Sequence, residues 1–512
     1  MTLVAIPHEN SASVSVFPVD RLSVLQPHPW RDRLENALRV GARPLTMYGR
    51  PTASGGRAVV VTAVLEHGES RVTVLRTVLD PEVGYHALTP EFAAMHCFER
   101  ELHEQHGVRV AGHPWMKPIR FEHTGAAGRD AYAFYEIKGK EVHEVAVGPI
   151  HASVIEPGSF RFMCLGEQVH HLEIHLGYQH RGVEKLLLGG DPSKLAPLVE
   201  TIAGDTSIAH TWAYCAAIEA LAGLETDLET DAARGVMLEL ERIAMHLAGL
   251  GGMAGDVAFL QGATTYGRLR TTAINTSMRL CGSRFGRGAI RPAGLGTRLR
   301  LEMRPSLRDV AEGGFTLAEL RSNLALLTQD VAIINDCFLA ARTVRHRLQG
   351  VGTVTTEAAA EVGLVGMAAR ASGIARDLRA TSGGIYRKHR IDPCTEATGD
   401  CWARARLRIE EINRSLAWIK SVTESYPRWE RVRGAVPALA PRQLAIAMVE
   451  GWRGEVVHTL ETGDDGTLLH YKVQDPSFRN WLGLALAVRE NEISDFPICN
   501  KSFDLSYCGN DL

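Results

Sequence analysis

The chain has 512 residues, of which 45% are hydrophobic and 22% charged, and such proportions belong to a soluble globular protein rather than a disordered one. Because this length exceeds what one ordinary hydrophobic core supports, we expect two domains or more. Lys and Arg number 56 against 59 Asp and Glu, with no Lys/Arg-rich block, which argues against a general nucleic-acid-binding protein.

The sequence indicates neither a membrane span nor a compact metal motif. It has no run of 18 or more apolar residues, and its first twenty residues lack the basic and apolar stretches of a secretion signal. Nine scattered cysteines without a CxxC pair predict reduced thiols in a cytosolic protein and argue against zinc or iron–sulfur motifs.

The first part of the chain has the pattern of an α/β domain. β-rich runs at 58–65 and 71–79, separated by EHGES, predict a hairpin. A helix is expected over TPEFAAMHCFERELHEQH, ended by Gly107. The proline-punctuated segment that follows is predicted to be extended, and residues 122–133 to be a linker.

The pattern changes at about residue 146. VAVGPIHASVIEPGSFRFMCLG predicts a β-hairpin whose loop carries His151. Apolar residues at steps of three and four in 235–252 and 403–419 predict two bundle helices, the first ending at Gly251–Gly252. Near the C-terminus EVVHTL, a GDDG turn and TLLHYKV predict a second hairpin.

The segment FERELHEQHGVRVAGHPWMKPIRF resembles the end of the small hydrophilic subunit of complex I that joins the quinone-site subunit. It has ERE at 99–101, Gly107–Val108, and GHP followed by PIR within 112–120. His103 stands where that family usually has an acidic residue. Glu99 and Glu101 are accordingly expected to make contacts between domains or subunits.

The remainder resembles the quinone-site subunit of complex I and the large subunits of membrane-bound nickel–iron hydrogenases. The matching stretches are GPIH (148–151), HRGVEKLL (180–187), LERIAMHLAGLG (240–251) with Asp256, ARASGIARDLR (369–379), GDCWARARLRIEEI (399–412), WRGEVVH (452–458) and NKSFDLSY (500–507). Fusion of both parts in one chain resembles the large subunits of formate hydrogenlyases, within the group 4 hydrogenases.

The resemblance implies an α+β fold in two parts. An α/β domain like the small hydrophilic subunit would cover residues 1–125, and a linker would cover 126–145. Residues 146–512 would form a helical bundle like that of nickel–iron hydrogenase large subunits, with small β-hairpins at its ends.

The nickel–iron ligands of that family are not matched in this chain. In catalytic hydrogenases the equivalent of ETIAGDTSIAH carries C-x-x-C-x-x-x-H, a second C-x-x-C lies near the C-terminus, and the four thiolates hold nickel, two of them bridging to iron. The cysteine positions fall here on Ala203, Thr206, Ser506 and Gly509, whereas the histidine is kept as His210. A nickel–iron centre is therefore not expected.

The quinone chemistry of complex I is only partly matched. The resemblance implies a hairpin histidine, an aspartate partner for it and a tyrosine. His151 and Asp256 match the first two, but the tyrosine falls on Gly204. Asp205 or Tyr507 would have to replace its hydroxyl, so a quinone is a candidate ligand and no cofactor is assigned to this chain.

Each candidate histidine and Asp256 has an ordinary alternative. His151 could be a plain loop residue rather than a cavity residue. His210 and His246 could be packing histidines rather than proton carriers, which histidine chemistry permits near neutral pH. Asp256 could cap a helix or form a salt bridge instead of pairing with His151.

Three further polar groups also have two interpretations. Asp205, Thr206 and Ser207 could be an N-cap cluster of a helix starting at 205 or 206, or a polar pocket. Arg453 matches an arginine that lies close to the hydrogenase metal, or it pairs with a carboxylate. The row of arginines 404, 406 and 408 with Glu410 and Glu411 is expected to form a solvated or subunit-facing surface.

The leading hypothesis is a peripheral-arm subunit, on the cytoplasmic side of the inner (plasma) membrane, of a complex-I-like, hydrogenase-related NADH:quinone oxidoreductase or similar assembly. It would dock on a small iron–sulfur subunit whose 4Fe–4S cluster faces the pocket, with membrane subunits below, and transfer electrons, to quinone, coupled to ion movement. The pocket residues that could carry protons are His151, Asp205, His210, Asp256, Arg453 and Asp504.

Other function classes are kept beside it. A redox-silent scaffold of the same complex would keep the interfaces without a substrate of its own. An active hydrogenase has the least support, because all four thiolates are replaced. A small-molecule dehydrogenase has none, since no strand–GxGxxG–helix fingerprint is present.

Overall fold

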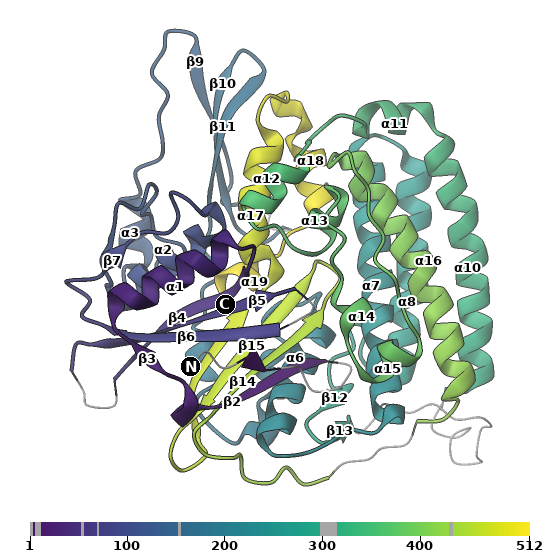
Figure 1. The fold of residues 1–512 in the computed structure, drawn as a ribbon. Coiled ribbons are helices and arrows are strands. Elements are labelled where there is room, and N and C mark those ends of the chain that lie inside the picture. Colours follow the sequence, from purple (N-terminus) through teal and green to yellow (C-terminus); the bar gives the residue numbers. More distant parts are fainter. Residues whose placement is uncertain are drawn as a thin grey trace.

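The structure is a computed structural model that describes residues 4–5, 12–52, 56–68, 71–151, 155–296, 299, 315–429 and 434–512. Helices and strands are mixed along the chain, in agreement with the predicted α+β class. Figure 1 shows strands in the middle of the molecule and a bundle of long helices on one side. The turn residues Glu69 and Ser70 and the loop residues 152–154 of the two predicted hairpins lie outside the described residues.

A five-stranded sheet is built by the first eighty residues. Its order is β1-β6-β5-β4, and β3 pairs parallel with β6. The strands are β1 (Val4–Ala5), β3 (Val24–Leu25), β4 (Arg43–Pro51), β5 (Val59–His67) and β6 (Arg71–Leu79). The antiparallel register of β5 and β6 runs from Val59 opposite Leu79 to His67 opposite Arg71, which confirms the predicted hairpin.

Two helices cover this sheet through one hydrophobic cluster. α1 (Pro27–Arg39) buries Trp30, Leu34 and Leu38. α2 (His96–His106) buries Phe98 and Leu102 in the same cluster. α2 ends at Gly107, as predicted, because this residue has a φ of 67°, which glycine adopts without a steric cost. The short strands β7 (Tyr85–His86) and β8 (Val110–Ala111) pair beside α2.

A second, four-stranded sheet combines both ends of the chain. Its order is β16-β15-β14-β2, with β2 (Ser13–Pro18), β14 (Gln443–Glu450), β15 (Glu455–Thr462) and β16 (Leu468–Gln474). β15 and β16 confirm the predicted C-terminal hairpin. Phe17, Val64 and Ile446 belong to a hydrophobic cluster shared by the two sheets, so the N-terminal and C-terminal parts of the chain are packed together.

A third sheet of three strands projects from the body at the top of Figure 1. It consists of β9 (Val142–Val147), β10 (Ser159–Leu165) and β11 (Gln168–His175) in the order β11-β10-β9. β9 and β10 pair antiparallel with His151 in the connection, which confirms the predicted first hairpin. Within the predicted linker, α3 (Gly125–Asp130) forms a short helix.

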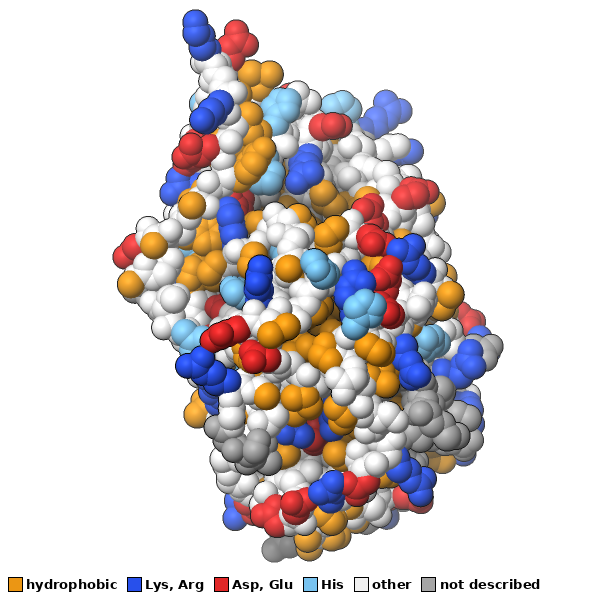
Figure 2. Space-filling view, turned by 60° about the vertical axis from the view of Figure 1, so that its left-hand side comes forward, with side chains coloured by type: hydrophobic (Ala, Val, Ile, Leu, Met, Phe, Trp, Pro, Cys, Tyr) orange, Lys and Arg blue, Asp and Glu red, His pale blue; other side chains and the backbone are white. Residues whose placement is uncertain are grey.

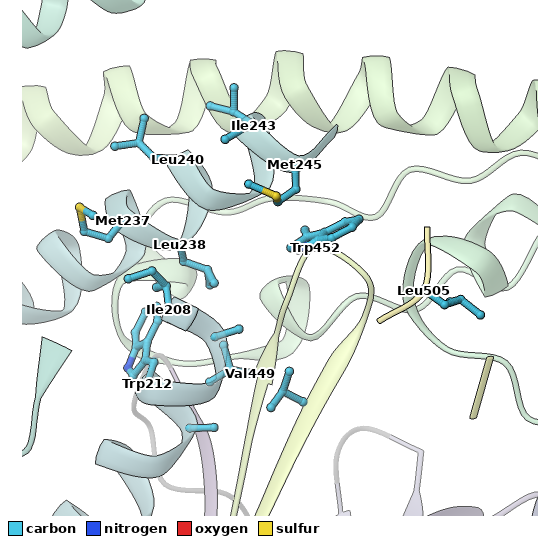
Figure 3. Packing of buried hydrophobic residues seen from close by; sticks show 14 of the residues in the cluster. Ile208, Trp212, Met237, Leu238, Leu240, Ile243, Met245, Val449, Trp452 and Leu505 are labelled. Carbon is cyan, nitrogen blue, oxygen red and sulfur yellow. The ribbon is translucent and has the colours of Figure 1, made fainter. Parts of the chain in front are cut away.

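Long helices form the bundle on the other side of the molecule. α7 (Leu228–Asp256) packs against α8 (Leu260–Cys281) and α16 (Cys401–Ser425), and α10 (Leu317–Ala340) packs on α8 and α16. α6 (Ser207–Leu221) lies between β14, β15 and α7. Its Ile208 and Trp212 pack beside Met237 and Leu238 of α7 (Figure 3). Both predicted bundle helices, in α7 and α16, are confirmed.

Shorter elements connect these layers. They are α4 (Val183–Leu186), α5 (Ala196–Val199), β12 (Ile290–Arg291), β13 (Gly294–Leu295), α11 (Arg342–Leu348), α12 (Thr356–Glu361), α13 (Gly366–Ala371), α14 (Leu378–Thr381), α15 (Gly384–Lys388), α17 (Pro476–Val488), α18 (Phe496–Phe503) and α19 (Tyr507–Asp511).

The predicted end of α7 at Gly251–Gly252 is wrong, because the helix continues to Asp256. The glycines serve close packing instead. A Cβ at Gly252 would lie 2.3 Å from Cε of Lys501, and one at Gly249 would lie 2.6 Å from Nε of Arg408. Helical glycines of this kind cost helix stability but let another element approach closely.

The sequence predicted that the charged row of α16 forms a surface. This prediction is wrong for three of its five residues. Arg404, Arg408 and Glu411 are fully buried, whereas Arg406 is exposed and Glu410 is half-exposed. Steps of three and four place the first three residues on the buried face, where Arg404 contacts α18 and Glu411 contacts α7, and the other two on the opposite face. Three members of the charged row therefore lie in the core and two at the surface.

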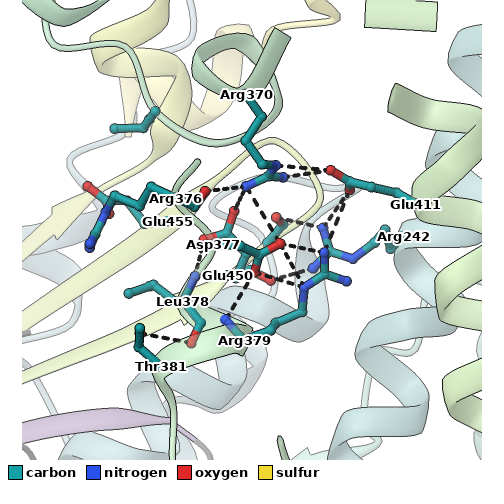
Figure 4. A network of polar contacts seen from close by, with 12 residues as sticks. Arg242, Arg370, Arg376, Asp377, Leu378, Arg379, Thr381, Glu411, Glu450 and Glu455 are labelled. Atoms are coloured by element: carbon teal, nitrogen blue, oxygen red, sulfur yellow. Dashed lines mark hydrogen bonds and ion pairs between the residues drawn. The ribbon is translucent and has the colours of Figure 1, made fainter. Parts of the chain in front are cut away.

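Glu411 belongs to what we call the arginine–carboxylate network (Figure 4). Its members are Arg242, Arg370, Arg379, Asp377, Glu239, Glu411 and Glu450, all buried. Arg370 donates to Glu411 at 2.7 Å and to Glu450 at 2.7 Å. Burial opposes ionisation of Glu411, but Arg370 and His246 hold its pKa well below the usual value. The network joins α7, α13, α14, α16 and β14.

The surface shown in Figure 2 has acidic and basic side chains interspersed with hydrophobic ones. Within the described residues, no single helix is long and apolar enough to cross a membrane. The bent pair α10 and α11, at 71°, passes the test of length and composition only as a pair.

Candidate functional site

Asp205 and Arg453 form an ion pair at the start of α6. Arg453 lies in the tight turn between β14 and β15, and it donates to both oxygens of the Asp205 carboxylate, at 2.7 and 2.6 Å. It also donates to the Thr206 hydroxyl at 3.1 Å and to the Asp504 carbonyl. Burial alone would lower the pKa of Arg453, but the neighbouring Asp205 carboxylate outweighs this effect, so the pKa is raised. Arg453 therefore ties segment 203–206 to segment 504–509.

The helix start expected at 205 or 206 is found one residue later, but neither Asp205 nor Thr206 caps the helix with its side chain. α6 begins at Ser207, and its N-cap residue Thr206 makes no side-chain cap hydrogen bond. Instead, the Glu241 carboxylate of α7 accepts hydrogen bonds from two backbone N–H groups of the first turn, that of Ile208 at 2.8 Å and that of Ala209 at 3.4 Å. Burial raises the pKa of Glu241 to about 8, with the charge of Asp205 contributing.

The four positions that carry cysteine in hydrogenases are buried here, in two segments that meet. Ala203, Thr206 and Ser506 have exposed fractions of 1%, 0% and 2%. Arg181 bridges the segments by donating to the carbonyls of Ile202, at 3.1 Å, and Cys508, at 3.4 Å. The resemblance thus locates one compact site from two distant motifs.

The residues present do not fit a nickel–iron centre. Alanine and glycine supply no ligand, and the Ser506 hydroxyl accepts the Gly509 N–H at 2.9 Å as the cap of α19. A Cβ at Gly509 would lie 2.6 Å from Cγ of Asp475, so the Asp475 carboxyl fills the space that a cysteine there would need. Among the described residues, no three His, Cys, Asp or Glu side chains are grouped to hold a metal ion.

His210 is part of a buried hydrogen-bonded series that we call the histidine chain. Its members are Asp475, His210, His458 and Tyr471, and all four are at most 1% exposed. The Nε2 of His210 lies 3.0 Å from Asp475, and its Nδ1 lies 3.0 Å from Nε2 of His458. The Nδ1 of His458 lies 2.6 Å from the Tyr471 hydroxyl.

One direction of donation satisfies every atom of the histidine chain. Tyr471 donates to Nδ1 of His458, whose Nε2–H donates to Nδ1 of His210, whose Nε2–H donates to Asp475. This assignment requires two neutral imidazoles and an ionised carboxylate. Burial lowers the pKa of His458 far below 6.5. Burial opposes ionisation of Asp475, but His210 and Arg453 lower its pKa.

His151 is half-buried at the base of the projecting hairpin. Its Nε2 lies 2.8 Å from the carbonyl of Gly158, in its own loop. The same loop contacts the start of α19, because Glu156 accepts the backbone N–H groups of Tyr507, at 3.2 Å, and Cys508, at 3.3 Å. His151 therefore lies near the Ser506 segment while its ring is held by a backbone partner.

Asp256 and Asp504 lie on the α7 and α18 side of the site. Asp256 is the exposed last residue of α7, and among the described residues no hydrogen bond or ion pair joins it to His151. Asp504 has a φ of 54° at the end of α18 and accepts a hydrogen bond from Lys501 at 2.8 Å. Asp504 is thus brought to the site through Arg453, and Asp256 is not.

The structure gives contacts for three further residues that the sequence singled out. His246 bonds to Glu411 at 2.8 Å, inside the arginine–carboxylate network. Glu101 joins α2 to the second sheet through Lys472, at 2.6 Å, as expected for a contact between domains. The interdomain interpretation of Glu99 is wrong, because its carboxylate accepts N–H groups of Leu88 and Thr89 in the N-terminal part.

Sequence reasoning missed four residues of the site: Asp475, His458, Tyr471 and Glu241. Asp475 had a visible signal, since Asp before Pro-Ser predicts a helix N-cap, and it caps α17 by accepting the Ser477 N–H at 2.8 Å. Its second partner, His210, is 265 residues away, and no local pattern reveals such a pairing.

Comparisons with known proteins identify relatives of this chain. The family model of the respiratory-chain NADH dehydrogenase 49 kDa subunit matches residues 256–442. A subunit of the NADH-quinone oxidoreductase of Clostridium beijerinckii is 30% identical over 334 residues, which cover 64% of this chain and 82% of the relative.

Hydrogenase subunits are similar over a longer part of the chain. Formate hydrogenlyase subunit 5 of Escherichia coli is 27% identical over 486 residues, which cover 90% of this chain and 82% of the relative. The alpha subunit of the membrane-bound hydrogenase of Pyrococcus furiosus is 28% identical over 378 residues, which cover 70% of this chain and 85% of the relative. The relation to both groups implied by the sequence motifs is confirmed.

Proposed function

Because this chain belongs to the family of the respiratory-chain NADH dehydrogenase 49 kDa subunit, we propose that it is a peripheral-arm subunit of a membrane-associated, complex-I-like assembly without a nickel–iron site. It would lie on the cytoplasmic side of the inner membrane. Its partners would be membrane subunits and a small iron–sulfur subunit carrying a 4Fe–4S cluster. Residues 1–125 would be the fused small hydrophilic subunit, joined by residues 126–145 to the quinone-site part.

The observation that supports this proposal is that protein side chains bond to one another around the positions that carry cysteine in hydrogenases. Asp475 lies where a side chain at Gly509 would have to be, and it is hydrogen-bonded to His210. Arg453 neutralises Asp205 across the former ligand positions. This closed set of bonds supports a site that handles electrons from a partner and protons from its own residues rather than hydrogen gas.

The proposed reaction is reduction of a quinone. Two electrons from the partner's cluster and two protons from the protein convert a quinone to a quinol. The residues that support such a site are His151 and Tyr507, whose rings both lie near Phe160, at 5.9 and 6.4 Å. Tyr507 offers a hydroxyl in place of the tyrosine that the family has at the position of Gly204. The histidine chain and Glu241 are the proton-holding groups.

Metal analysis tests the first half of the proposal. We expect the natively purified complex, with its subunits identified by mass spectrometry, to contain iron and an iron–sulfur subunit but no stoichiometric nickel. One nickel per chain would contradict the interpretation of Ala203, Thr206, Ser506 and Gly509. A complex without an iron–sulfur partner would contradict the electron-transfer proposal.

A redox-silent scaffold is the second candidate, favoured by the backbone partner of the His151 ring. His151→Gln separates the two, provided that the complex still assembles. Electron transfer through the complex to a quinone is expected to fall at least tenfold if His151 serves the site, and to stay unchanged in a scaffold. His143→Gln, at an exposed histidine on the same hairpin, is the matched control.

A further inference from the structure

A cavity of about 670 Å³ opens beside the site, and its charges are not balanced. Its lining includes Gly204, Asp205 and Asp504 from the site and four cations: Arg270, Arg284, Arg287 and Lys501. The volume is within the range of small-ligand sites. None of the properties assigned above to the metal or quinone positions requires these four cations.

Both carboxylates of the cavity are already neutralised by other groups. Asp205 is bound at both oxygens by Arg453, which stands behind it. Asp504 bonds to Lys501 at 2.8 Å, and although burial opposes ionisation, Lys501, Arg453 and Arg408 lower its pKa. Neither carboxylate is therefore left to compensate the remaining three arginines.

Those three arginines have no acidic partner within the part of the chain that the structure describes. Arg270 and Arg284 lie beside the Phe285 ring, at 5.9 and 5.6 Å from its centre, so the ring supports both guanidinium groups. The Nε of Arg270 is sealed from solvent and has no hydrogen-bond partner among the described residues. Because solvent does not reach this nitrogen, an anion in the cavity would pair with the three guanidinium groups that line it rather than with the Nε of Arg270.

Gly204 gives this cavity its open floor. A Cβ placed on Gly204 would meet only Nη2 of Arg287, at 3.7 Å, so the guanidinium of Arg287 reaches over a position that carries no side chain. A larger side chain at 204 would fit the backbone but would occupy the space in front of Arg287.

We propose that this arginine-lined cavity binds a small oxyanion, a carboxylate or a phosphate, through Arg270, Arg284 and Arg287. Guanidinium groups match such ligands because they donate two parallel hydrogen bonds to a pair of oxygens. The proposed ligand is an anion, whereas a quinone is uncharged. The proposal therefore holds whether or not the subunit transfers electrons.

Isothermal titration of the purified full-length chain tests the proposal, with oxalate and inorganic phosphate as the probes. We expect saturable binding of at least one of them, weaker at higher salt as charge pairing requires. Binding of oxalate alone would identify a carboxylate ligand, and binding of phosphate a phosphorylated or inorganic one. Failure of both probes to bind would overturn the proposal.

Variants assign the binding to this cavity. Arg270→Gln and Arg287→Gln are each expected to weaken binding about tenfold or more, since each removes a charge-assisted hydrogen bond. Gly204→Tyr, which fills the cavity floor, is expected to abolish it. Arg268→Gln, two residues from Arg270 and exposed on α8, is the control and should bind as the wild type does. Equal affinity in Arg287→Gln and wild type would contradict the assignment.

Discussion

Two buried polar regions lie close together in this molecule and are built differently. The arginine–carboxylate network pairs its acids with guanidinium groups that are charged at every accessible pH. The histidine chain contains two imidazoles, a phenol and one carboxylate, groups whose protonation can change. The first arrangement can only hold elements together, whereas the second can also hold and release a proton. Burial alone therefore does not distinguish structural from functional polar groups in this fold.

The largest effect is expected from breaking the network at Glu411. Glu411→Gln removes the charge shared by Arg370 and His246 and leaves buried cations uncompensated. We expect the free energy of unfolding to fall by about 3–5 kcal/mol, measured by urea denaturation of the purified chain. Glu410→Gln, at the half-exposed neighbouring position, should change it by less than about 0.5 kcal/mol. Equal effects of the two variants would contradict the burial of alternate members of this row.

The next largest effect concerns pH and involves His458 of the histidine chain and His246, which is hydrogen-bonded to Glu411 of the network. Burial lowers the pKa of His246 to about 4 and that of His458 far below 6.5. A lowered histidine pKa means that the unfolded state binds more protons, so stability is present above about pH 6.5 and lost as pH falls toward the folded pKa.

Between pH 7.5 and 5 the loss from His246 is about 2 kcal/mol, and His458 changes stability in the same direction. Urea melts at pH 7.5, 6 and 5 measure it, and His246→Gln should flatten the dependence. His143→Gln, exposed on β9, should keep the wild-type slope. A wild-type stability that rises on acidification would show that these imidazoles are charged in the folded protein.

A smaller effect is expected from Asp475→Asn, which keeps the shape of the chain but removes its negative charge. The lost charge-assisted hydrogen bond to His210 should cost about 1.5–3 kcal/mol at pH 7. Since the pKa of Asp475 is lowered in the folded protein, this difference should shrink as pH falls below about 4. Asp464→Asn, in an exposed ion pair, is the control, and a difference independent of pH would mean that Asp475 is not ionised.

The smallest effect is expected from Tyr471→Phe, at the far end of the histidine chain. It removes the donor to Nδ1 of His458 and should cost about 1 kcal/mol. The variant keeps the ring packing, so the urea midpoint should shift without a change of slope. Tyr135→Phe, at an exposed tyrosine, should shift nothing. A null result at Tyr471 would mean that a water or another group replaces the hydroxyl.

Periodicity and turn chemistry predicted most of the local structure. The hairpin of β5 and β6, the end of α2 at Gly107 and the bundle helices α7 and α16 all carry patterns that are read within about twenty residues. The end of α7 was predicted wrongly, because a pair of glycines in the sequence can either end a helix or let another side chain pack closely against it. Gly252 does the second, since it lies against Lys501.

The candidate site was predictable where a motif carried it and unpredictable where a partner came from far away. Family motifs identified the meeting of the Ala203 and Ser506 segments. The contacts of Arg408 and Glu411 inside the protein could not be seen, because a charged residue in a helix gives no indication of its partner. The pairing of His210 with Asp475 could not be predicted for the same reason, since only the folded chain brings Asp475 beside α6.

The pairing of β2 with β14 has a consequence for how the protein is made. Gln443, opposite Pro18 in the sheet, leaves the ribosome roughly 20–85 seconds later at about 5–20 residues per second. Throughout this interval β2 has no β14 to pair with, and its apolar side chains Val14 and Phe17, which belong to different hydrophobic clusters of the folded protein, are not yet covered. Nascent chains of this protein therefore carry an unpaired strand for most of their synthesis. A chaperone that binds such segments would stay bound longest at β2.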